Sequence, residues 1–329
     1  PLKQSTLSNT AREPLPSPDL CLFIIVIFLY LHCLSLSFTP RLPRPGETIH
    51  GNRFFTGFGG KGANQCVQAS RLGATTAILA KVGQDHFGES YIKNLKENNV
   101  NTDFVSQTDG ASTGVAQITV DDEGQNSIVI VAGANLFLRP EDLVCVEEAL
   151  ASSKVLVCQL EVRPETTAQA LRYARRHGVK TILNPAPATE DLDPELFELA
   201  DILCVNETEA EMLAKQPVRN VKEAEKVALS LLKHGCQATI ITLGPSGCVV
   251  AQNRDPTPHH LPSQSVQALD TTGAGDSFVG ALAFYLARRP DLGLVEIAQR
   301  SCMVAAVSVT ARGTQSSYPF RSSLPDVLF

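Results

Sequence analysis

The sequence predicts an α/β fold built around a mostly parallel β-sheet with helices on both faces. Two observations support this prediction. After Pro45, short apolar runs alternate with amphipathic segments, and most runs are followed by a polar turn and then a helical pattern. Repeated strand and helix units of this kind form parallel sheets. The chain has 329 residues, of which 43% are apolar, enough for one large domain or two smaller ones.

Hydrophobic periodicity gives the individual elements. Strands are predicted, in chain order, at residues 76–82, 154–159, 180–184, 201–205, 239–243 and 266–269. Helices are predicted at residues 63–72, 165–176, 207–215, 221–233 and 277–288. Residues 253–264 are typical of a proline-rich loop.

Two regions depart from the alternation of strands and helices. Residues 48–58 and 113–131 have the pattern strand, turn, strand, and 121–124 is the expected turn of the second region. These regions predict a small separate sheet attached to the α/β core. Such a sheet often serves as a lid or a dimer surface.

The apolar stretch at residues 20–38, LCLFIIVIFLYLHCLSLSF, has two competing interpretations. Its length meets the requirement for a membrane span, about 20 residues. Basic residues flank it on both sides, however, so the charge asymmetry that would orient a span is missing. Its centre, residues 22–29, is rich in β-branched and aromatic residues, as in a buried parallel strand. On this local pattern the two interpretations stand level, and a signal peptide is disfavoured because no small-x-small cleavage site follows.

Charge and cysteine usage exclude several classes of function. The formal net charge of −6 argues against a general affinity for nucleic acid or anionic lipid. The nine cysteines are scattered singly, with no CxxC pair and no histidine at metal-ligand spacing. The sequence therefore indicates neither a disulfide framework nor a zinc site, and it favours a reducing compartment.

The most informative stretch is DTTGAGDSF at residues 270–278, which precedes a predicted helix. Gly273 and Gly275 allow backbone N–H groups to face one point at the helix N-terminus, where an anion such as phosphate is favoured. Asp276 stands at the same point and is placed to accept a proton from an attacking hydroxyl. The structural alternative is a glycine turn with Asp276 as an ordinary N-cap.

A second glycine-rich stretch, GFGGKGAN at residues 57–64, opens the first predicted helix. Lys61 and Asn64 supply donors for a polyhydroxylated ligand. The stretch is not a Walker A loop, because Ala63 takes the place of the serine or threonine that binds magnesium. A tight turn without a ligand is the alternative.

Two further groups follow predicted strands. Asn206 and Glu209 are placed either to face nucleotide phosphates and their Mg²⁺ or to form a capping box at the next helix. Glu161 comes just after the strand at 154–159, where open parallel sheets bind ligands.

Five motifs in this order resemble the ribokinase branch of the PfkB carbohydrate kinase family, vertebrate members in particular. They are GGKGAN at 59–64, NPAPA at 184–188, NETEA at 206–210, ITLG at 241–244 and DTTGAGD at 270–276. The resemblance extends from about Arg41 to the C-terminus. It implies a ribokinase-like three-layer fold with lid strands at about 45–58 and 103–131. It also implies transfer of the ATP γ-phosphate to the 5-hydroxyl of D-ribose.

The resemblance assigns roles to individual residues. It implies Asp276 as the base, with the backbone amides of Gly273, Ala274 and Gly275 stabilising the phosphate charge. The implied ribose contacts are Gly60, Lys61, Asn64, Glu161 and Asp276. The implied nucleotide contacts are Asn206, Glu209, Thr242, Leu243, Gly244, Gly247, Gly275 and Cys302. The positions that match the family's activating monovalent cation site, usually for K⁺, are Asp270, Thr272, Ser308, Ala311, Gly313 and Ser317.

The resemblance further implies ATP with Mg²⁺, a homodimer formed through the lid, and a location in the cytoplasm and also the nucleus. Residues 1–40 are then an atypical N-terminal segment before a kinase domain at 41–329. Because the family fold needs a buried strand shortly before Arg41, residues 22–30 are the candidate. This requirement favours the strand over a membrane anchor at 20–38.

Two departures from the family pattern affect substrate binding. Counting back from Arg41, the family's sugar-binding turn falls on Leu29 and Tyr30, and its Asn and Asp positions fall on His32 and Leu34. The carboxylate is therefore missing. Cys302 stands where the family commonly has a polar residue near the adenine.

These departures leave two hypotheses of different classes. The first is an active cytosolic sugar kinase whose N-terminus is atypical, mis-spliced or wrongly predicted. The second is a catalytically weak sugar- or nucleotide-binding relative anchored through 20–38. Among enzymes, the alternative is another PfkB kinase that acts on fructose or a nucleoside.

Overall fold

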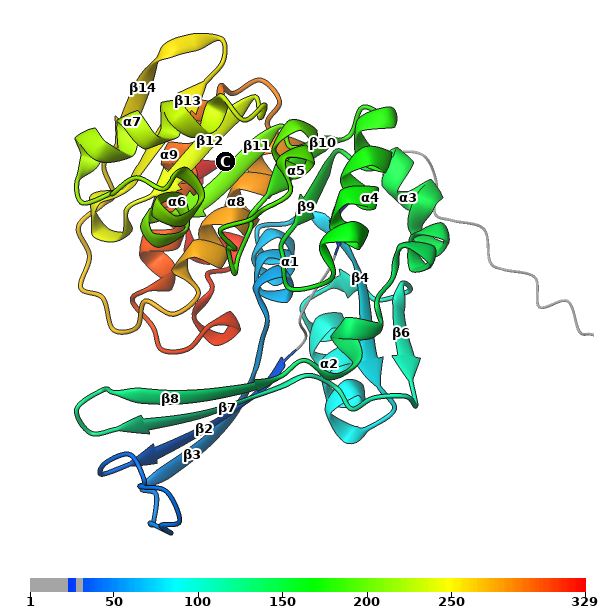
Figure 1. Cartoon of the computed structure of the whole chain (residues 1–329), viewed down its shortest axis with the longest axis vertical. Helices are drawn as coiled ribbons and strands as arrows, with labels where there is room; N and C mark the ends of the chain where they lie inside the picture. The colour runs from blue at the N-terminus through cyan, green and yellow to red at the C-terminus, as the bar shows by residue number, and fades with distance from the viewer. Residues whose placement is uncertain (1–22, 28–31) are drawn as a thin grey trace, which may run out of the picture.

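A large sheet forms the centre of the molecule. The structure is a computed structural model that describes residues 23–27 and 32–329. The strand order of the sheet is β14-β13-β12-β11-β10-β9-β1-β4-β5, with β6 beside β4 (Figure 1). The pairs from β12 to β5 and β6 are parallel, and only β13 and β14 join antiparallel. The strands are β1 Phe23–Ile27, β4 Thr75–Gly83, β5 Val100–Asn101, β6 Val105–Thr108, β9 Val155–Cys158, β10 Lys180–Leu183, β11 Ile202–Asn206, β12 Ala238–Thr242, β13 Cys248–Gln252 and β14 Asp255–Leu261.

Helices cover both faces of this sheet, so the predicted three-layer α/β fold is confirmed. One buried cluster joins the sheet to α1, α2, α8 and α9, and a second joins it to α3 to α7. Along β9 the side chains alternate between the two clusters: Val155 and Val157 belong to the first, Leu156 and Cys158 to the second. The helices are α1 Lys61–Arg71, α2 His86–Glu97, α3 Glu147–Ser152, α4 Pro164–Arg176, α5 Pro194–Leu199, α6 Glu207–Ala214, α7 Val221–Leu232, α8 Ala274–Arg288 and α9 Leu294–Ser308.

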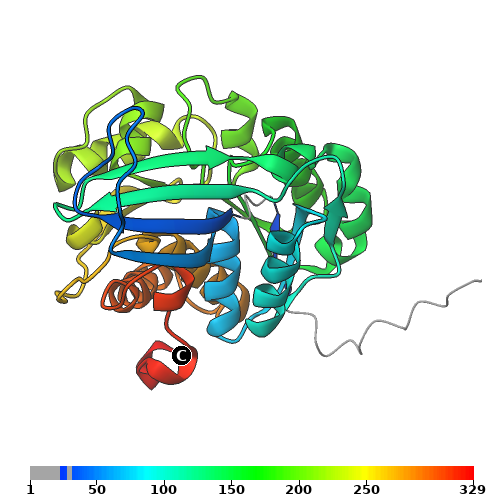
Figure 2. The ribbon, with the colours of Figure 1, turned by 90° about the horizontal axis from the view of Figure 1, so that it is seen from below.

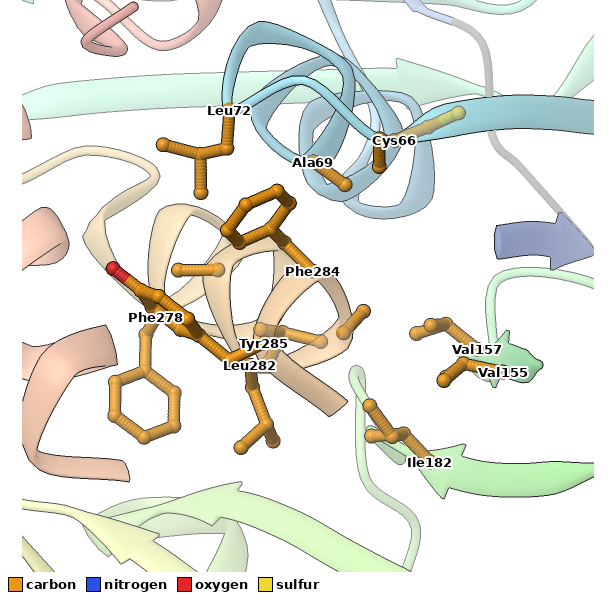
Figure 3. Packing of buried hydrophobic residues seen from close by; sticks show 14 of the residues in the cluster. Cys66, Ala69, Leu72, Val155, Val157, Ile182, Phe278, Leu282, Phe284 and Tyr285 are labelled. Carbon is orange, nitrogen blue, oxygen red and sulfur yellow. The ribbon is translucent and has the colours of Figure 1, made fainter. Parts of the chain in front are cut away.

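Helix α8 lies in the core, and its packing against α1 brings the functional residues of both helices together. Figure 3 shows Phe284 of α8 directed towards Ala69 and Leu72 of α1. Burying such a phenylalanine stabilises the fold by about 1.5–3 kcal/mol. The two helices are tightly packed at Gly280, where a Cβ atom would lie 2.5 Å from the carbonyl oxygen of Gln65. A larger residue there would separate the starts of the two helices.

A second, four-stranded sheet projects from the α/β body in the order β3-β2-β7-β8 (Figures 1 and 2). Strands β2 and β7 pair in parallel, whereas β3 and β8 join the outer edges antiparallel. The expected turn at 121–124 is present, closed by the Gly124 N–H on the Asp121 carbonyl at 3.0 Å. The strands of this sheet, called the lid below, are β2 His32–Thr39, β3 Arg53–Gly59, β7 Val115–Asp121 and β8 Asn126–Val131.

The apolar stretch at 20–38 contributes to both sheets. Strand β1 lies between β4 and β9 at the centre of the large sheet, in parallel register with both. Strand β2 belongs to the lid. Residues 20–22 and 28–31, including the expected turn at Leu29 and Tyr30, lie outside the described residues. Across the described ranges, none of the helices has the length and hydropathy that a membrane crossing requires.

Several predicted boundaries were wrong. The lid contains β2, which was not predicted, and the strand predicted within 48–58 begins only at Arg53. The segment at 105–108, which was expected in the lid, pairs with β4 in the large sheet as β6. Residues 266–269 form no strand: Val266 and Ala268 line a cavity, and the Leu269 N–H donates to the Val309 carbonyl at 2.8 Å. The proline-rich segment contains β14, which lies at the edge of the sheet, where proline is tolerated because one side of the strand has no partner.

Candidate active site

The predicted site residues gather at the carboxyl ends of the central parallel strands and at the starts of α1 and α8. Asn206 ends β11, Thr242 ends β12, and Glu161 follows β9 by three residues. Open parallel sheets bind their ligands at this edge. The structure thus places these three residues at the edge of the sheet where a ligand is expected.

The residues expected to hold a sugar form one connected group. The backbone N–H of Lys61 donates to Oε2 of Glu161 at 2.9 Å, and Nδ2 of Asn64 donates to Oδ2 of Asp276 at 2.9 Å. Gly60 caps α1 with φ +103°, a backbone conformation that favours glycine. The structure thus brings all five predicted sugar contacts to one place.

The Lys61 ammonium is the positive charge of this group. Burial opposes its charge, but the attraction of Asp276, Glu161 and Glu209 outweighs burial and raises the pKa of Lys61. Lys61 therefore stays charged at neutral pH. It is positioned to neutralise negative charge that a ligand brings into the site.

Asp276 lies in the first turn of α8 and is 8% exposed. Burial raises its pKa, while Lys61 and hydrogen bonds from Asn64 and Gln65 act in the opposite direction. A carboxylate with a raised pKa is a stronger base than an exposed one. The N-cap interpretation of Asp276 is wrong, because Gly273 is the cap residue and no side chain caps this helix.

The start of α8 depends on Gly273. Its φ is +79°, and a Cβ atom there would lie 2.5 Å from the Tyr318 hydroxyl oxygen. That hydroxyl donates to the Gly273 carbonyl at 2.9 Å. The Ala274 N–H donates to the Thr271 carbonyl at 3.2 Å, so this amide of the expected anion site already has a partner. Beside Gly275 the space is open, since a Cβ atom there would meet nothing within 4 Å.

A cavity of about 370 Å³ opens next to Gly275. It is lined by most of the expected nucleotide contacts, namely Thr242, Gly244, Gly247, Gly275 and Cys302. The remaining walls, which the sequence did not reveal, come from the irregular segment after β14 and from α8 and α9, and include Ser263, Gln264, Ser265, Val266, Phe278, Ala305, Ala306 and Val309.

Three of the expected nucleotide contacts do not line this cavity. Leu243 is buried, and its N–H donates to the Gly247 carbonyl at 2.8 Å. Asn206 and Glu209 form the capping box that was the structural alternative: Asn206 Oδ1 accepts from the Glu209 N–H at 2.8 Å, and Glu209 Oε2 accepts from the Asn206 N–H at 3.0 Å. The carboxyl of Glu209 nevertheless faces the charges of Lys61 and Asp276.

Asp270 joins the two loops that carry the expected cation positions. Its carboxylate accepts from the Thr272 N–H at 3.0 Å and from the Gly313 N–H at 2.9 Å. Burial opposes the charge of Asp270, but these hydrogen bonds and Arg312 lower its pKa, so it stays ionised. Ser308 is the last residue of α9 and Ser317 ends the short helix Gln315–Ser317, and their hydroxyls donate to the Ala305 and Thr314 carbonyls.

By the family resemblance, the oxygens expected to hold the cation belong to the Asp270 carboxylate, to hydroxyls and to main-chain carbonyls. Such hard oxygen donors suit alkali and alkaline-earth cations. Across residues 23–27 and 32–329, no three His, Cys, Asp or Glu side chains are grouped as a metal site would require.

Gln65 is the polar residue of this site that sequence reasoning missed. Its Nε2 donates to Oδ1 of Asp276 at 2.9 Å, so neighbouring amide side chains on α1, Asn64 and Gln65, hold the two oxygens of one carboxylate. The one available signal was a pair of adjacent amides in a helix that is otherwise buried.

Comparisons with known proteins find similar sequences and structures. Residues 25–321 match the family model described as pfkB family carbohydrate kinase. The chain is 58% identical to mouse ribokinase over 294 residues, which cover 89% of this chain and 91% of the mouse protein. It is 41% identical to a deoxyribokinase of Salmonella typhi over 285 residues, 86% of this chain and 92% of that protein. The structure of Arabidopsis thaliana ribokinase complexed with ribose and ATP superimposes with a TM-score of 0.84 at 27% identity, covering 91% of this chain and 96% of that one.

Proposed function

Because this chain belongs to the pfkB family of carbohydrate kinases, we propose that it transfers the γ-phosphate of ATP to the 5-hydroxyl of D-ribose. The observation that carries the proposal is Asp276, which lies at the start of α8 between the sugar-binding group and the nucleotide cavity. The similarity to ribokinases over about nine-tenths of the chain supports ribose as the acceptor.

The chemistry follows from the charges of the site. Asp276 accepts the proton of the sugar hydroxyl as the oxygen attacks the γ-phosphorus; the new O–P bond forms while the bond to the β-phosphate oxygen breaks, and ADP leaves. Lys61, Asn64 and Glu161 orient the sugar. The positive end of the α8 dipole and the Gly275 amide stabilise negative charge on the transferred group. Positioning and electrostatics supply most of the catalysis in such transfers.

Two cations belong to this proposal. Mg²⁺ usually binds through substrate phosphates and one or two carboxylates, and the carboxyl of Glu209, which interacts electrostatically with Lys61, would supply one of them. A monovalent cation, K⁺ by family analogy, would be held by the loops that Asp270 joins, from Asp270, Thr272, Ser308, Ala311, Gly313 and Ser317. Bound there, it would add positive charge near the start of α8. The location in cytoplasm and nucleus stays a prediction, which cell fractionation can test.

A substrate panel tests the proposed function. The purified protein is assayed for ADP release with ribose, 2-deoxyribose, fructose and adenosine, each with K⁺ and with Na⁺ at equal ionic strength. We expect the highest kcat/KM with ribose and K⁺. Asp276→Asn should lower kcat by about a hundredfold or more, the usual contribution of a general base.

The panel also separates the alternatives. A preference for fructose or adenosine would identify another kinase of the family. A folded protein without turnover on any sugar would be a binding relative and would contradict the proposal. Thermal stabilisation by KCl but not NaCl would report the cation site independently of activity.

A further inference from the structure

We propose that Gln65 is a positioning residue for this reaction: its side-chain amide holds the Asp276 carboxylate ready to accept the hydroxyl proton. The inference rests on the proposed function, because it takes Asp276 as the base. Asn64 is an expected sugar contact, whereas Gln65 is placed to act on the base from within the protein core.

Gln65 is fully engaged in the interior. It is 1% exposed, and its Nε2 donates both to Oδ1 of Asp276 and to Oδ1 of Asn184, each at 2.9 Å. Its Oε1 accepts from Nε2 of Gln159 at 2.6 Å. The two amide hydrogens and the carbonyl oxygen therefore all have partners, which fixes the side chain in one rotamer.

The direction of these hydrogen bonds follows from groups that can only accept. Nδ2 of Asn184 donates to the Cys204 carbonyl at 2.9 Å, so Oδ1 of Asn184 must face Gln65. An ionised Asp276 also only accepts. Turning the Gln65 amide over would place its oxygen against two acceptor oxygens. The network thus has one self-consistent arrangement, and that arrangement favours the ionised form of Asp276.

The network connects the base to the rigid part of the fold. Asn184 follows β10, Cys204 lies on β11 and Gln159 follows β9, so three neighbouring strands of the large sheet fix the amide of Gln65. The close approach of α1 and α8 then places this amide against Asp276. Side chains that are held by such surroundings keep a catalytic group in productive geometry.

Among the described residues, three titratable groups interact with Asp276 besides the amides. Lys61 attracts its negative charge, Glu209 repels it, and the Tyr318 hydroxyl lies close enough to be affected by it. Burial raises the pKa of Asp276, and the hydrogen bond from Gln65 lowers it. Removing that donor should raise the pKa further. Because the base works in its deprotonated form, the acid limb of the pH–rate profile should move to higher pH.

Gln68 is a matched control on the same helix. It is one turn further along α1, 0% exposed, and likewise an amide that is hydrogen-bonded through both its nitrogen and its oxygen. Its Nε2 donates to the Pro319 carbonyl at 3.1 Å, and its Oε1 accepts from the Ser277 hydroxyl at 2.9 Å. Gln68→Met therefore removes an equally buried amide without touching the Asp276 carboxylate.

The test compares the kcat/KM profiles for ribose of wild type, Gln65→Met and Gln68→Met between pH 4 and pH 9. We expect Gln65→Met to move the acid limb upward by about one pH unit, the effect of one hydrogen bond to a charged group. Its activity should recover at high pH, and the KM for ribose should change little. The acid limb of Gln68→Met should coincide with that of wild type. Equal acid limbs for all three proteins would overturn the inference.

A second variant covers the case in which Gln65→Met does not fold, which melting temperature would report. Gln65→Glu keeps the side-chain size and the acceptor for Gln159 but replaces the donor by a carboxyl group, so the acid limb should again move upward; an unchanged limb would overturn the inference. Failure of the proposed function looks different: wild type would not phosphorylate ribose, or Asp276→Asn would retain full activity.

Discussion

Leu34 on β2 lies beside the loop that is proposed to bind the sugar. A Cβ atom built on Gly59 would be 3.0 Å from Cδ1 of Leu34, and Gly59 leads directly into Gly60 and Lys61. By the family resemblance a carboxylate belongs at this position. Its loss costs about 1.5–3 kcal/mol for a charge-assisted hydrogen bond to a hydroxyl, roughly ten- to a hundredfold in affinity. We therefore expect Leu34→Asp to lower the KM for ribose by about that factor, with kcat little changed.

Leu36 provides the control for this residue. It lies two positions further along β2, on the same face of the strand and farther from the loop, opposite Phe55. Leu36→Asp should leave the KM for ribose unchanged in a steady-state assay. Comparing ribose with 2-deoxyribose adds a second readout, because a gain for ribose alone would mean that the new carboxylate contacts the 2-hydroxyl. Equal effects of the two substitutions would contradict the role of Leu34.

At the scale of one element, the start of α8 depends on a left-handed cap residue. Gly273→Ala would force a side chain into φ +79° and within 2.5 Å of the Tyr318 hydroxyl. We expect a loss of about 1–3 kcal/mol in the free energy of unfolding, typical of backbone strain. We also expect a lower kcat, since the α8 amides and Asp276 shift together. Urea unfolding and initial rates measure the two effects.

Gly293 is the control for Gly273, because it is also a glycine at the N-cap of a helix. It caps α9 with φ −72°, and a Cβ atom there would meet nothing within 4 Å. Gly293→Ala should therefore leave the free energy of unfolding within about 0.5 kcal/mol of wild type, as for most surface substitutions. If both alanine variants lost the same stability, strain at Gly273 would not be the cause.

The elements also show what sequence can and cannot predict. The central strands were found because residues such as Val155 to Cys158 are apolar on both faces, the mark of a buried parallel strand. Strand β2 was missed because it follows β1 within one apolar stretch. Its own signal was present in the alternation of Leu34, Leu36 and Phe38 with serines, which is typical of a half-buried strand.

The residues of the candidate site also fall into those that the sequence predicted and those that it did not. Asp276, Lys61 and Asn64 belong to short motifs whose glycines and polar residues carry a local chemical meaning. The partnership of Gln65 with Asp276 joins residues 211 positions apart and depends on the packing of α1 against α8. The cavity wall at 263–268 likewise forms only where this irregular segment meets α8 and α9. Such contacts arise from tertiary packing, which local periodicity does not encode.

At the scale of the whole molecule, the lid leaves apolar side chains uncovered. All four residues from Ile128 to Val131 on β8 are more than half exposed, at 51%, 61%, 56% and 54%. Successive side chains of a strand point to opposite faces, so both faces of β8 are apolar. Within the part of the chain that the structure describes, β8 is also an edge strand, with unpaired backbone groups along one side. Exposed apolar surface of this extent marks an interaction site.

We propose that a second copy of the chain covers this surface, so that the lid forms a homodimer interface. In a two-fold dimer each substitution acts twice, and burying one isoleucine is worth about 1.5–3 kcal/mol. Ile130→Asp should therefore weaken dimerisation by about a hundredfold or more. Sedimentation at micromolar concentration should show a dimer for wild type and a monomer for the variant.

Val144→Asp is the control for this substitution. Val144 is 70% exposed and lies outside the lid, in the short helix Pro140–Val146, so its change should leave the dimer intact. A monomeric wild type would contradict the interface, and dissociation by both substitutions would point to a general loss of folding. Because β3 of the lid runs directly into Gly60 and Lys61, a dimer that orders the lid also orders the sugar-binding loop. The monomeric variant should then show a higher KM for ribose, and it should regain affinity at protein concentrations that restore the dimer.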